Sequence, residues 1–381
     1  MVAARFYPAL GGLEGQARLL GKTLVARQQV TAITVLTRRF GGWAPRETLD
    51  GMEVVRLPWG DKNRWLASAS YISAALARAR FSGFDLLHCF QSYSPATIGS
   101  LCSLLGGPPA IVKITASNEY GEVRELGRLP FAGLRQRLLR HIARFVIVNR
   151  TMQTELESIG IPAAKIRYIP NGTLIPELGD DREAVRAQAK AELGIPFGQA
   201  LVFTGRLSEE KRLDVALDAL ARLLPRYPDL GLVLVGDDGG YRGVEAQLRA
   251  MAKERGLVER VLFTGRVPNV APYLRAADLF VLLSVSEGLS NALLEAMAYS
   301  CPVVATDIPA NQDVFDDGQE GLKVPVGDVA ATAAAIELLA SDPRLRRSFG
   351  ERARHRATEK FSIDAVAWQH EELYREVIDE A

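Results

Sequence analysis

Short apolar runs alternate with amphipathic stretches along the whole chain. Runs with the length and composition of buried strands occur at 30–38, 84–90, 109–115, 144–149 and 166–169, and again at 200–206, 231–237, 260–267, 278–284 and 302–306. Apolar residues recur at helical spacing at 16–27, 65–80 and 133–143, and later at 210–224, 243–255, 269–276, 290–299 and 328–340. This regular alternation is typical of α/β proteins with parallel sheets.

The pattern stops once and then starts again. Residues 173–181 have few periodic signals and separate the two series of strands and helices. The length of 381 residues suits two domains of roughly 100–200 residues each. We therefore predict two Rossmann-like, doubly wound domains, over 1–175 and 176–362, followed by an amphipathic segment at 361–381.

The first strand has an unusual start. Only Val2, Ala3 and Ala4 precede polar and turn residues, whereas strands most often run for about five or six residues. Either this strand is short, or a few of its residues are missing from the start.

Composition is that of an ordinary globular protein, with 48% apolar and 24% charged residues. The three cysteines, Cys89, Cys102 and Cys301, have neither the spacing of metal ligands nor that of a disulfide framework, which favours a reducing cytosol. No apolar run approaches the roughly 18 residues of a membrane span. Since no signal peptide opens the chain either, we expect a cytoplasmic location.

The net charge of +1 hides opposite charges in the two halves. Residues 1–179 contain 22 Lys and Arg against 12 Asp and Glu, and residues 180–381 contain 24 against 33. A basic half is suited to phosphates or to an anionic surface. The alternative is an uneven distribution of solvated charge without a binding role.

A first candidate site follows the strand at 200–206. Gly205 and Arg206 end this strand, and Lys211 lies near the start of the next helix. Doubly wound sheets bind ligands at the carboxyl ends of their strands, and both cations can bind phosphate oxygens. Two cations beside a turn are also common as plain surface charge.

A second candidate site lies in 286–298, which read SEGLSNALLEAMA. Glu287 precedes a helix capped by Ser290 or Asn291, and Glu295 lies about one and a half turns into that helix. The N–H groups at a helix start attract an anion such as a diphosphate, and the glycine after the first glutamate permits close approach. Carboxylates accept hydrogen bonds from vicinal hydroxyls, so the glutamates could bind a sugar and a ribose with the phosphates between them. The alternative is a solvent-exposed helix with an acidic first part.

Two further turns occupy similar positions. Gly265, Arg266 and Val267 close a strand and could present backbone groups to the edge of a nucleobase. Gly11 and Gly12 precede a helix and could face a phosphate or an acceptor. The chain has no Walker loop, no His-Glu-x-x-His and no cluster of metal ligands, so we predict neither a metal site nor a cofactor.

Together these motifs resemble the family 4 retaining glycosyltransferases, also called glycosyl transferases group 1. The resemblance covers nearly the whole chain and rests on GGLEG (11–15), YIPNG (168–172), FTGRLSEEKRLD (203–214), FTGRV (263–267), SEGLSNALLEAMA (286–298) and CPVVATDIPANQD (301–313). It implies the GT-B architecture, in which two Rossmann-like domains face each other across a cleft. The first domain would bind the acceptor, the second would bind a nucleotide sugar, and the last helix, 363–381, would cross back to the first.

The resemblance also implies roles for single residues. Arg206 and Lys211 would neutralise the donor diphosphate, Glu287 would contact the donor sugar, and Glu295 would hold the ribose. The other residues implied to bind the donor are Gly205, Arg266, Val267, Gly288, Leu289, Ser290 and Asn291. Gly11 and Gly12 would form a loop facing the diphosphate and the acceptor.

One segment departs from the family pattern. Many relatives have a histidine after the first-domain strand that ends here at Ile114, whereas this chain continues Thr-Ala-Ser-Asn-Glu. Asn118 or Glu119 would take over as the hydrogen-bonding group, and the pattern does not decide between them.

The implied reaction is a retaining transfer of a hexose-type sugar from a UDP- or GDP-type donor to a glycan or lipid-linked acceptor, in polysaccharide or glycolipid biosynthesis. The cations would stabilise the leaving diphosphate without a metal. Two alternatives stay open. One is another enzyme of the same architecture, a nucleotide-sugar epimerase or a phosphorylase, and the other is a non-catalytic nucleotide-sugar-binding protein.

The stretch 124–144 combines basic and apolar residues. Its arginines are Arg124, Arg128, Arg135, Arg137, Arg140 and Arg144, and Phe131, Leu134, Leu138, Leu139 and Ile142 lie among them. A basic amphipathic helix is typical of a membrane-surface element. We therefore predict peripheral docking on anionic lipid at the inner face of the plasma membrane, a lipid-linked acceptor, and no nucleic acid partner. The alternative is a surface helix whose apolar face packs on its own domain.

Overall fold

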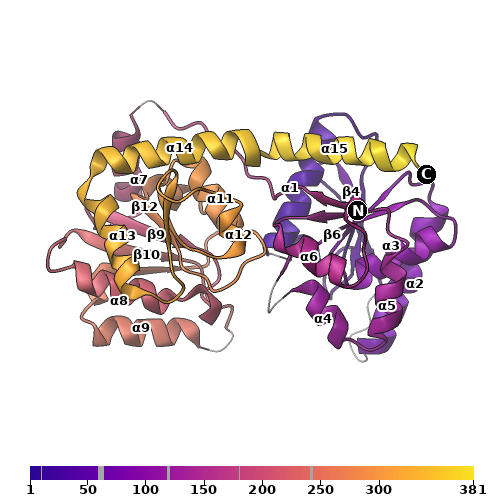
Figure 1. Ribbon diagram of the computed structural model, residues 1–381, viewed down its shortest axis with the longest axis horizontal. Coiled ribbons are helices and arrows are strands. Elements are labelled where there is room, and N and C mark those ends of the chain that lie inside the picture. Colours follow the sequence, from indigo (N-terminus) through magenta and orange to yellow (C-terminus); the bar gives the residue numbers. More distant parts are fainter. Residues whose placement is uncertain (10, 59–63, 118–120, 180, 241–242) are drawn as a thin grey trace. The chain divides into compact units, whose positions relative to one another are not determined.

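The computed structural model describes residues 1–9, 11–58, 64–117, 121–179, 181–240 and 243–381. The chain divides into two compact units: unit 1 consists of Met1–Gly172 and Ile363–Ala381, and unit 2 of Thr173–Ser362. Each unit is built around one sheet (Figure 1). The predicted fold class, with two α/β domains of doubly wound parallel sheets, is confirmed.

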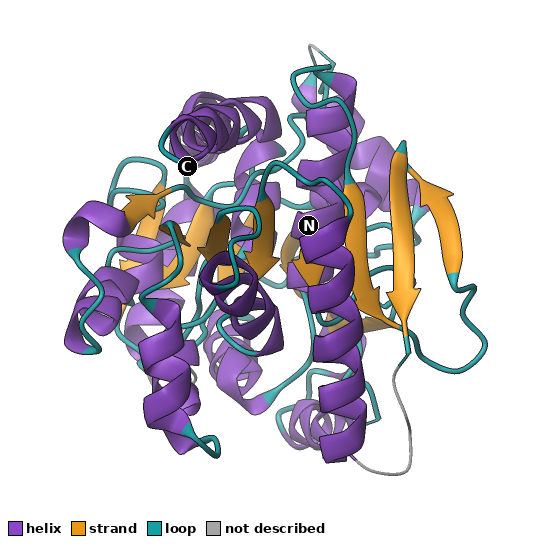
Figure 2. Ribbon diagram, turned by 90° about the vertical axis from the view of Figure 1, so that its right-hand side faces the viewer, coloured by secondary structure: helices purple, strands orange, loops and turns teal. Residues whose placement is uncertain are grey.

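In the described part of unit 1, eight strands form a sheet in the order β3-β4-β2-β1-β5-β6-β7-β8. The strands are β1 (Val2–Ala3), β2 (Thr34–Arg38), β3 (Arg46–Leu49), β4 (Met52–Leu57), β5 (Leu87–Phe90), β6 (Ala110–Lys113), β7 (Arg144–Ile147) and β8 (Ile166–Tyr168). The helices are α1 (Gly12–Ala26), α2 (Arg64–Phe81), α3 (Ser94–Leu104), α4 (Glu122–Arg128), α5 (Ala132–Leu139), α6 (Thr151–Ser158) and α15 (Ile363–Asp379). Figure 2 shows helices on both faces of this sheet.

Burial explains the apolar runs of unit 1. All residues of β5 and β6 are buried, because helices cover both faces of a parallel sheet. The hairpin β3–β4 is antiparallel and was not predicted. It turns at Asp50 and Gly51, which both have positive φ, and an Asp-Gly pair is a known signal for this turn.

Unit 2 has a sheet whose described strands are all parallel and follow the order β11-β10-β9-β12-β13-β14. The strands are β9 (Gln199–Thr204), β10 (Leu230–Val235), β11 (Val261–Gly265), β12 (Leu279–Leu282), β13 (Val303–Thr306) and β14 (Gly321–Val324). The helices are α7 (Arg182–Glu192), α8 (Leu213–Leu223), α9 (Val244–Glu254), α10 (Ala271–Ala276), α11 (Asn291–Ala298), α12 (Pro309–Gln312), α13 (Val329–Ser341) and α14 (Pro343–Phe361). The order reverses between β9 and β12, and doubly wound sheets bind ligands at such a switch point.

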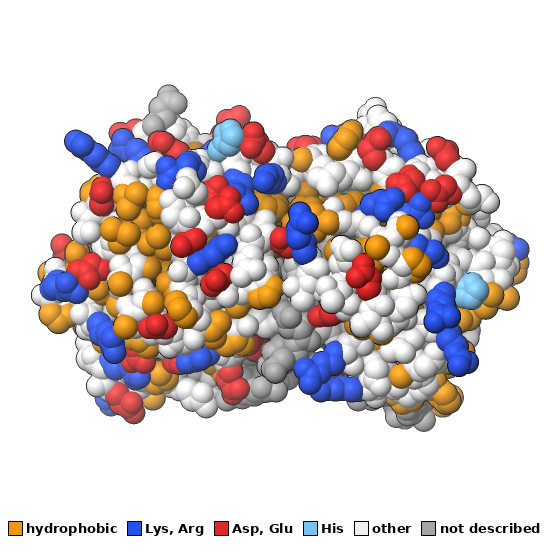
Figure 3. All heavy atoms as spheres, viewed as in Figure 1, with side chains coloured by type: hydrophobic (Ala, Val, Ile, Leu, Met, Phe, Trp, Pro, Cys, Tyr) orange, Lys and Arg blue, Asp and Glu red, His pale blue; other side chains and the backbone are white. Residues whose placement is uncertain are grey.

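Helix α15 lies far from the rest of unit 1 in sequence, yet its acidic residues meet basic residues there. Arg27 donates to both carboxylate oxygens of Glu371, at 2.7 and 3.0 Å. Arg144 donates to Glu376 and Glu380, at 2.7 and 2.6 Å. Figure 3 shows red acidic and blue basic side chains side by side along the upper edge of unit 1, where α15 lies in Figure 1. Part of the positive charge of the first half is therefore neutralised within the chain.

The predicted single basic helix over 124–144 is wrong. The segment forms α4 and α5, separated at 129–131, because Pro130 disfavours a helical conformation at Leu129 and Phe131 has a left-handed φ of 61°. Arg144 lies in β7 and is paired with α15. In the described ranges, no helix combines the length and the apolar character needed to span a bilayer.

Candidate functional site

Most of the predicted site residues meet at the carboxyl edge of the sheet in unit 2. Lys211 ends the 3-10 turn Glu209–Lys211 after β9, and Glu287 lies in the loop after the adjacent strand β12. Lys211 Nζ donates to Glu287 Oε1 at 2.6 Å, and the two side chains are 17% and 12% exposed. The cation and the carboxylate, predicted from separate motifs, thus form one pair at the strand switch point.

Further hydrogen bonds hold this pair in place. The buried Ser284 Oγ donates to the same Glu287 oxygen at 2.7 Å, and Thr306 Oγ1 donates to the Ser284 carbonyl at 2.6 Å. The Val285 N–H donates to the Glu210 carbonyl at 2.9 Å, which ties the loop after β12 to the turn after β9. No role was predicted for Ser284, although its place at the end of the strand 278–284 is visible in the sequence.

Arg206 lies at the same edge but points to solvent. Its side chain is 67% exposed and is 3.5 Å from Glu210 Oε1. An exposed pair at this distance holds a side chain weakly. Arg206 is therefore able to reorient toward an anion at the edge.

Helix α11 begins beside Glu287. Of the two predicted caps, Ser290 is the N-cap, with Oγ accepting from the Leu293 N–H at 3.4 Å, and Asn291 is the first helical residue. Leu289 and Ser290 are buried, and Gly288 is half-buried. The N-terminal end of α11 thus adds a partial positive charge at the edge that holds Lys211.

Glu295 lies inside α11. Part of the residue reaches the surface, yet burial raises the pKa of its carboxyl to about 7. A carboxyl group with this pKa changes its charge near neutral pH.

Glycines let the strand ends approach closely. The Gly205 N–H donates to the Val235 carbonyl at 2.9 Å, and the Gly236 N–H donates to the Gly265 carbonyl at 3.0 Å. A Cβ on Gly236 would lie 1.9 Å from the Gly205 carbonyl oxygen. Gly236 was not predicted as a site residue, although the pattern of a strand followed by Gly, seen at 205 and 265, repeats there.

The turn after β11 follows these glycines. Gly265 has a left-handed φ of 66°, Arg266 is exposed and Val267 is half-exposed. The predicted residues of this turn therefore lie at the carboxyl edge, two strands from β9.

The remaining predicted residues belong to unit 1. Gly11 is the N-cap of α1 and Gly12 is its first residue, and the Gly15 N–H donates to the Gly11 carbonyl at 2.9 Å. The glycine turn is therefore already the start of the helix, which was predicted to begin at residue 16. Asn118 and its alternative, Glu119, lie outside the described residues.

A buried carboxylate near that segment was not predicted. Glu122 is 1% exposed and accepts hydrogen bonds from the Ser92 N–H at 2.5 Å, the Thr115 N–H at 2.7 Å and Thr115 Oγ1 at 2.6 Å. It joins the loops that follow β5 and β6. Burial raises the pKa of its carboxyl, and the hydrogen bonds oppose this shift. In the sequence, Glu122 could have been found as an acidic residue shortly after the loop that follows a predicted strand.

Comparisons with known proteins agree with this geometry. The family model of glycosyl transferases group 1 matches residues 186–356, and that of the glycosyl transferase 4-like domain matches residues 11–172. The chain is 31% identical over 260 residues to the lipopolysaccharide core biosynthesis mannosyltransferase LpsB of Rhizobium meliloti (strain 1021), covering 65% of this chain and 73% of that protein. It is 28% identical over 385 residues to a phosphatidyl-myo-inositol mannosyltransferase of Mycobacterium leprae (strain TN), covering 99% of this chain and 96% of that protein.

A solved structure shares the fold. The crystal structure of Anabaena Alr3699/HepE in complex with UDP-glucose superimposes with a TM-score of 0.81, covers 100% of this chain and 99% of its own, and is 19% identical.

Proposed function

The chain belongs to the glycosyl transferases group 1, the family 4 glycosyltransferases of the GT-B fold, and on this premise we propose its donor and its stereochemistry. It is a glycosyltransferase of glycolipid or polysaccharide biosynthesis. The proposal is that it transfers a hexose-type sugar from a nucleoside-diphosphate sugar to a glycan or lipid-linked acceptor, with retention of configuration. The observation that carries the proposal is the contact of Lys211 with Glu287 at the strand switch point.

The proposed donor site uses the charges at this edge. Lys211, Arg206 and the N-terminal end of α11 offset the diphosphate charge. Glu287 and Glu295 accept hydrogen bonds from the hydroxyls of the sugar and the ribose. The UDP-glucose complex of a protein with the same fold supports a donor of this class. Arg266 and Val267 are proposed to flank the base.

In the proposed reaction, the bond between the anomeric carbon and the diphosphate oxygen breaks. The acceptor oxygen attacks the same face of the sugar, and its proton passes to the departing phosphate oxygen. The step needs positive charge where the leaving group becomes more negative, and Lys211 and Arg206 supply it. We propose that these side chains make a metal ion unnecessary.

The proposed acceptor is presented by unit 1 at a membrane surface. The elbow between α4 and α5 exposes Phe131 (75%) and Leu134 (58%), and Arg124 of α4 and Arg137 of α5 are also exposed. Exposed apolar side chains among arginines suit an anionic bilayer. This elbow replaces the long helix expected from the sequence, and its proposed role is to dock unit 1 at a membrane that carries a lipid-linked saccharide.

The donor proposal is tested by calorimetric titration with UDP, GDP and ADP in the presence of a chelator. We expect one nucleotide to bind to the chain and to the variant Lys253→Ala, which removes an exposed lysine of α9, and to bind much more weakly to Lys211→Ala. Equal affinities for Lys211→Ala and the unaltered chain would exclude the proposed diphosphate contact.

The reaction is tested by NMR of the product formed from the nucleotide sugar that binds. An α-configured donor should give an α-linked product, and omission of the acceptor should leave the donor sugar unchanged. Conversion of the donor without an acceptor would instead identify an epimerase. Binding without any turnover would identify a non-catalytic binding protein.

A further inference from the structure

Two of the four histidines of the chain are buried where α15 packs on the sheet of unit 1. His88 lies in β5 and is 3% exposed, and His370 lies in α15 and is 0% exposed. Their ring centroids are 5.4 Å apart, so the two rings lie close together across the interface between helix and sheet. The other two histidines, His141 and His355, are exposed.

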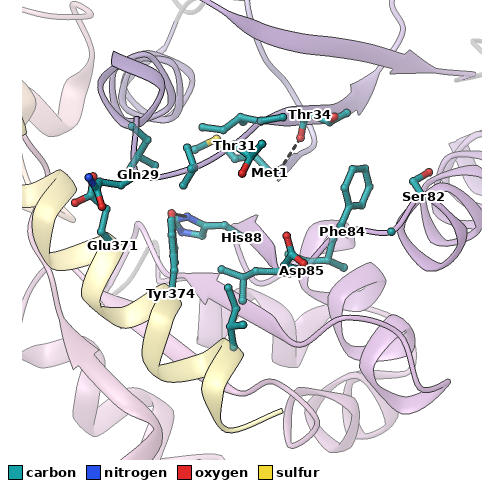
Figure 4. Close-up of a pocket in the computed structure, with 18 of the residues that line it drawn as sticks. Met1, Gln29, Thr31, Thr34, Ser82, Phe84, Asp85, His88, Glu371 and Tyr374 are labelled. Carbon is teal, nitrogen blue, oxygen red and sulfur yellow. Dashed lines mark hydrogen bonds between the residues drawn. The ribbon is translucent and has the colours of Figure 1, made fainter. Parts of the chain in front are cut away.

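Hydrogen bonds engage only one nitrogen of each buried ring. His370 Nδ1 lies 2.9 Å from the Val366 carbonyl and must donate to it, so the neutral ring has no proton on Nε2. His88 Nδ1 is 2.7 Å from the Tyr374 hydroxyl, and these two side chains point toward one another (Figure 4). Among the described residues, the buried Nε2 atom of each ring has no hydrogen-bond partner. A second proton on either ring would therefore leave a buried N–H group without an acceptor.

The charges around the two rings also oppose a second proton. Lys113 lies in β6, the strand next to β5, and its ammonium lowers the pKa of both rings. Burial lowers the pKa of Lys113 itself to about 7, so its positive charge is complete only below neutral pH. The Met1 ammonium acts on His88 in the same direction, and Glu371 of α15 already accepts two hydrogen bonds from Arg27 of α1. Mild acid thus adds positive charge to a buried region that already carries it.

The position of α15 is therefore linked to pH. Burial, the largest cause, lowers the pKa of His370 to about 3 and that of His88 well below its ordinary 6.5. With α15 detached, both rings meet water and take up a proton near the ordinary pKa. The docked helix thus loses stability relative to the detached one as the pH falls below 6.5. Glu376 keeps its charge in this range, because its hydrogen bond from Arg144 lowers its pKa below the ordinary 4.5.

We propose that His88 and His370 make α15 a pH-sensitive strap, which is docked on unit 1 while both rings are neutral and is released when they take up protons. Apolar side chains hold the docked helix, namely Ile363, Val366, Ala367, Leu373 and Val377. Release lets the rings reach water, which accepts the hydrogen bonds that the interface does not. The strap is independent of the proposed sugar transfer, whose donor-site residues belong to unit 2.

The test is hydrogen exchange of the α15 amides in the full chain from pH 7.5 to 5.5, corrected for the intrinsic exchange rate at each pH. The opening constant of α15 should rise about tenfold for each histidine and roughly 100-fold for both. Glutamine takes up no proton in this range, so the rise in His370→Gln should be about tenfold smaller. His88→Gln is a second variant with the same expected effect. His355→Gln, at an exposed position of α14, is the matched control and should behave as the unaltered chain does.

Three results would overturn the proposal. One is an opening constant of α15 that does not change with pH in the unaltered chain. Another is the same pH dependence in the unaltered chain and in the His88→Gln and His370→Gln variants. The third is exchange of the α2 amides that accelerates as much as that of α15, because unit 1 would then unfold as a whole. No readout needs a nucleotide sugar or an acceptor, so failure here leaves the proposed function intact.

Discussion

Lys211 and Glu287 are 76 residues apart in sequence but form an ion pair with an Nζ–Oε1 distance of 2.6 Å. Each residue follows a strand, and the adjacency of β9 and β12 brings the two turns together. Because both side chains are largely buried, water and salt screen the pair less than they screen a surface pair. The pair places a positive charge at the strand switch point without adding net charge to the free protein.

Lys211→Ala should lower the rate of sugar transfer roughly 100–1000-fold, because it removes a charge that stabilises the leaving diphosphate. The measurement is the initial rate of product formation at saturating donor. Lys253→Ala, on the exposed part of α9, should leave this rate unchanged. Near-normal turnover of Lys211→Ala would contradict the assigned role.

Nucleotide binding should strengthen as the pH rises from 6 to 8. Burial raises the pKa of Glu295 to about 7 from an ordinary 4.5, so its carboxyl becomes a charged acceptor for ribose hydroxyls only over this range. The dissociation constant should fall roughly tenfold, as the ionised fraction changes. Titration calorimetry of Glu295→Gln at the same pH values gives the comparison, and an equal pH dependence in this variant would exclude Glu295 as its source.

The same shift has a consequence for stability. The folded chain favours protonated Glu295, so the stability linked to this proton is present below pH 4.5 and is lost as the pH rises through about 7. Urea unfolding should therefore show Glu295→Gln gaining stability relative to the unaltered chain between pH 5 and 8. A constant difference over this range would contradict the shifted pKa.

Gly236→Ala should separate the ends of β9 and β10 and weaken nucleotide binding. The new Cβ would lie 1.9 Å from the Gly205 carbonyl oxygen, and residue 236 has a φ of 138° that only glycine readily adopts. Gly133→Ala is the matched control, because a Cβ there meets nothing within 4 Å and the site lies in α5. Calorimetry with the preferred nucleotide should show loss of affinity only for Gly236→Ala.

Features that depend only on the local order of residues, such as the ends of strands, could be predicted from the sequence. Strand ends are visible as apolar runs that stop at Gly or Ser, so Gly205, Gly265 and Ser284 marked the carboxyl edge of the sheet in advance. That Lys211 bonds to Glu287 depends on the order of the strands, which no local pattern contains. For the same reason the Gly236–Gly205 approach could not be foreseen.

Other differences between the prediction and the structure arise where one feature of the sequence hides another. α14 is rich in arginine, so its helical period was hidden, although Asp342 caps it by accepting from the Arg344 and Leu345 N–H groups. The mixture of basic and apolar residues in 124–144 suggested one amphipathic helix, but Pro130 interrupts the helix. The acidic residues of α15 contribute to the negative charge of residues 180–381, although in the structure they pair with arginines of unit 1.

Arg27→Ala should loosen α15 from unit 1. Glu371, which is 3% exposed, would lose both hydrogen bonds from Arg27 and stay buried as an unpaired carboxylate, at a cost of about 2 kcal/mol. Hydrogen exchange should show faster opening of α15 amides. Arg375→Ala removes a half-exposed side chain that pairs with Glu372 and donates to Gln29 Oε1 at 3.0 Å on the surface, and it should change exchange less, because exposed contacts contribute little. Equal effects of both variants would show that the buried pair does not anchor the helix.

Replacement of Phe131 and Leu134 by serine should reduce binding to vesicles of anionic lipid, because their exposed apolar surface is proposed to enter the bilayer interface. Flotation with phosphatidylserine vesicles measures the bound fraction. Added salt should weaken binding of the unaltered chain, since Arg124 and Arg137 contribute through charge. Phe81→Ser is the control: Phe81 is 81% exposed at the end of α2, outside the α4–α5 elbow, so a general apolar effect would lower binding in this variant as well. Loss of binding in the Phe131 and Leu134 variant alone assigns docking to the elbow, equal binding of all three proteins would exclude the elbow as the docking element, and no binding of the unaltered chain would remove the membrane from the proposed function.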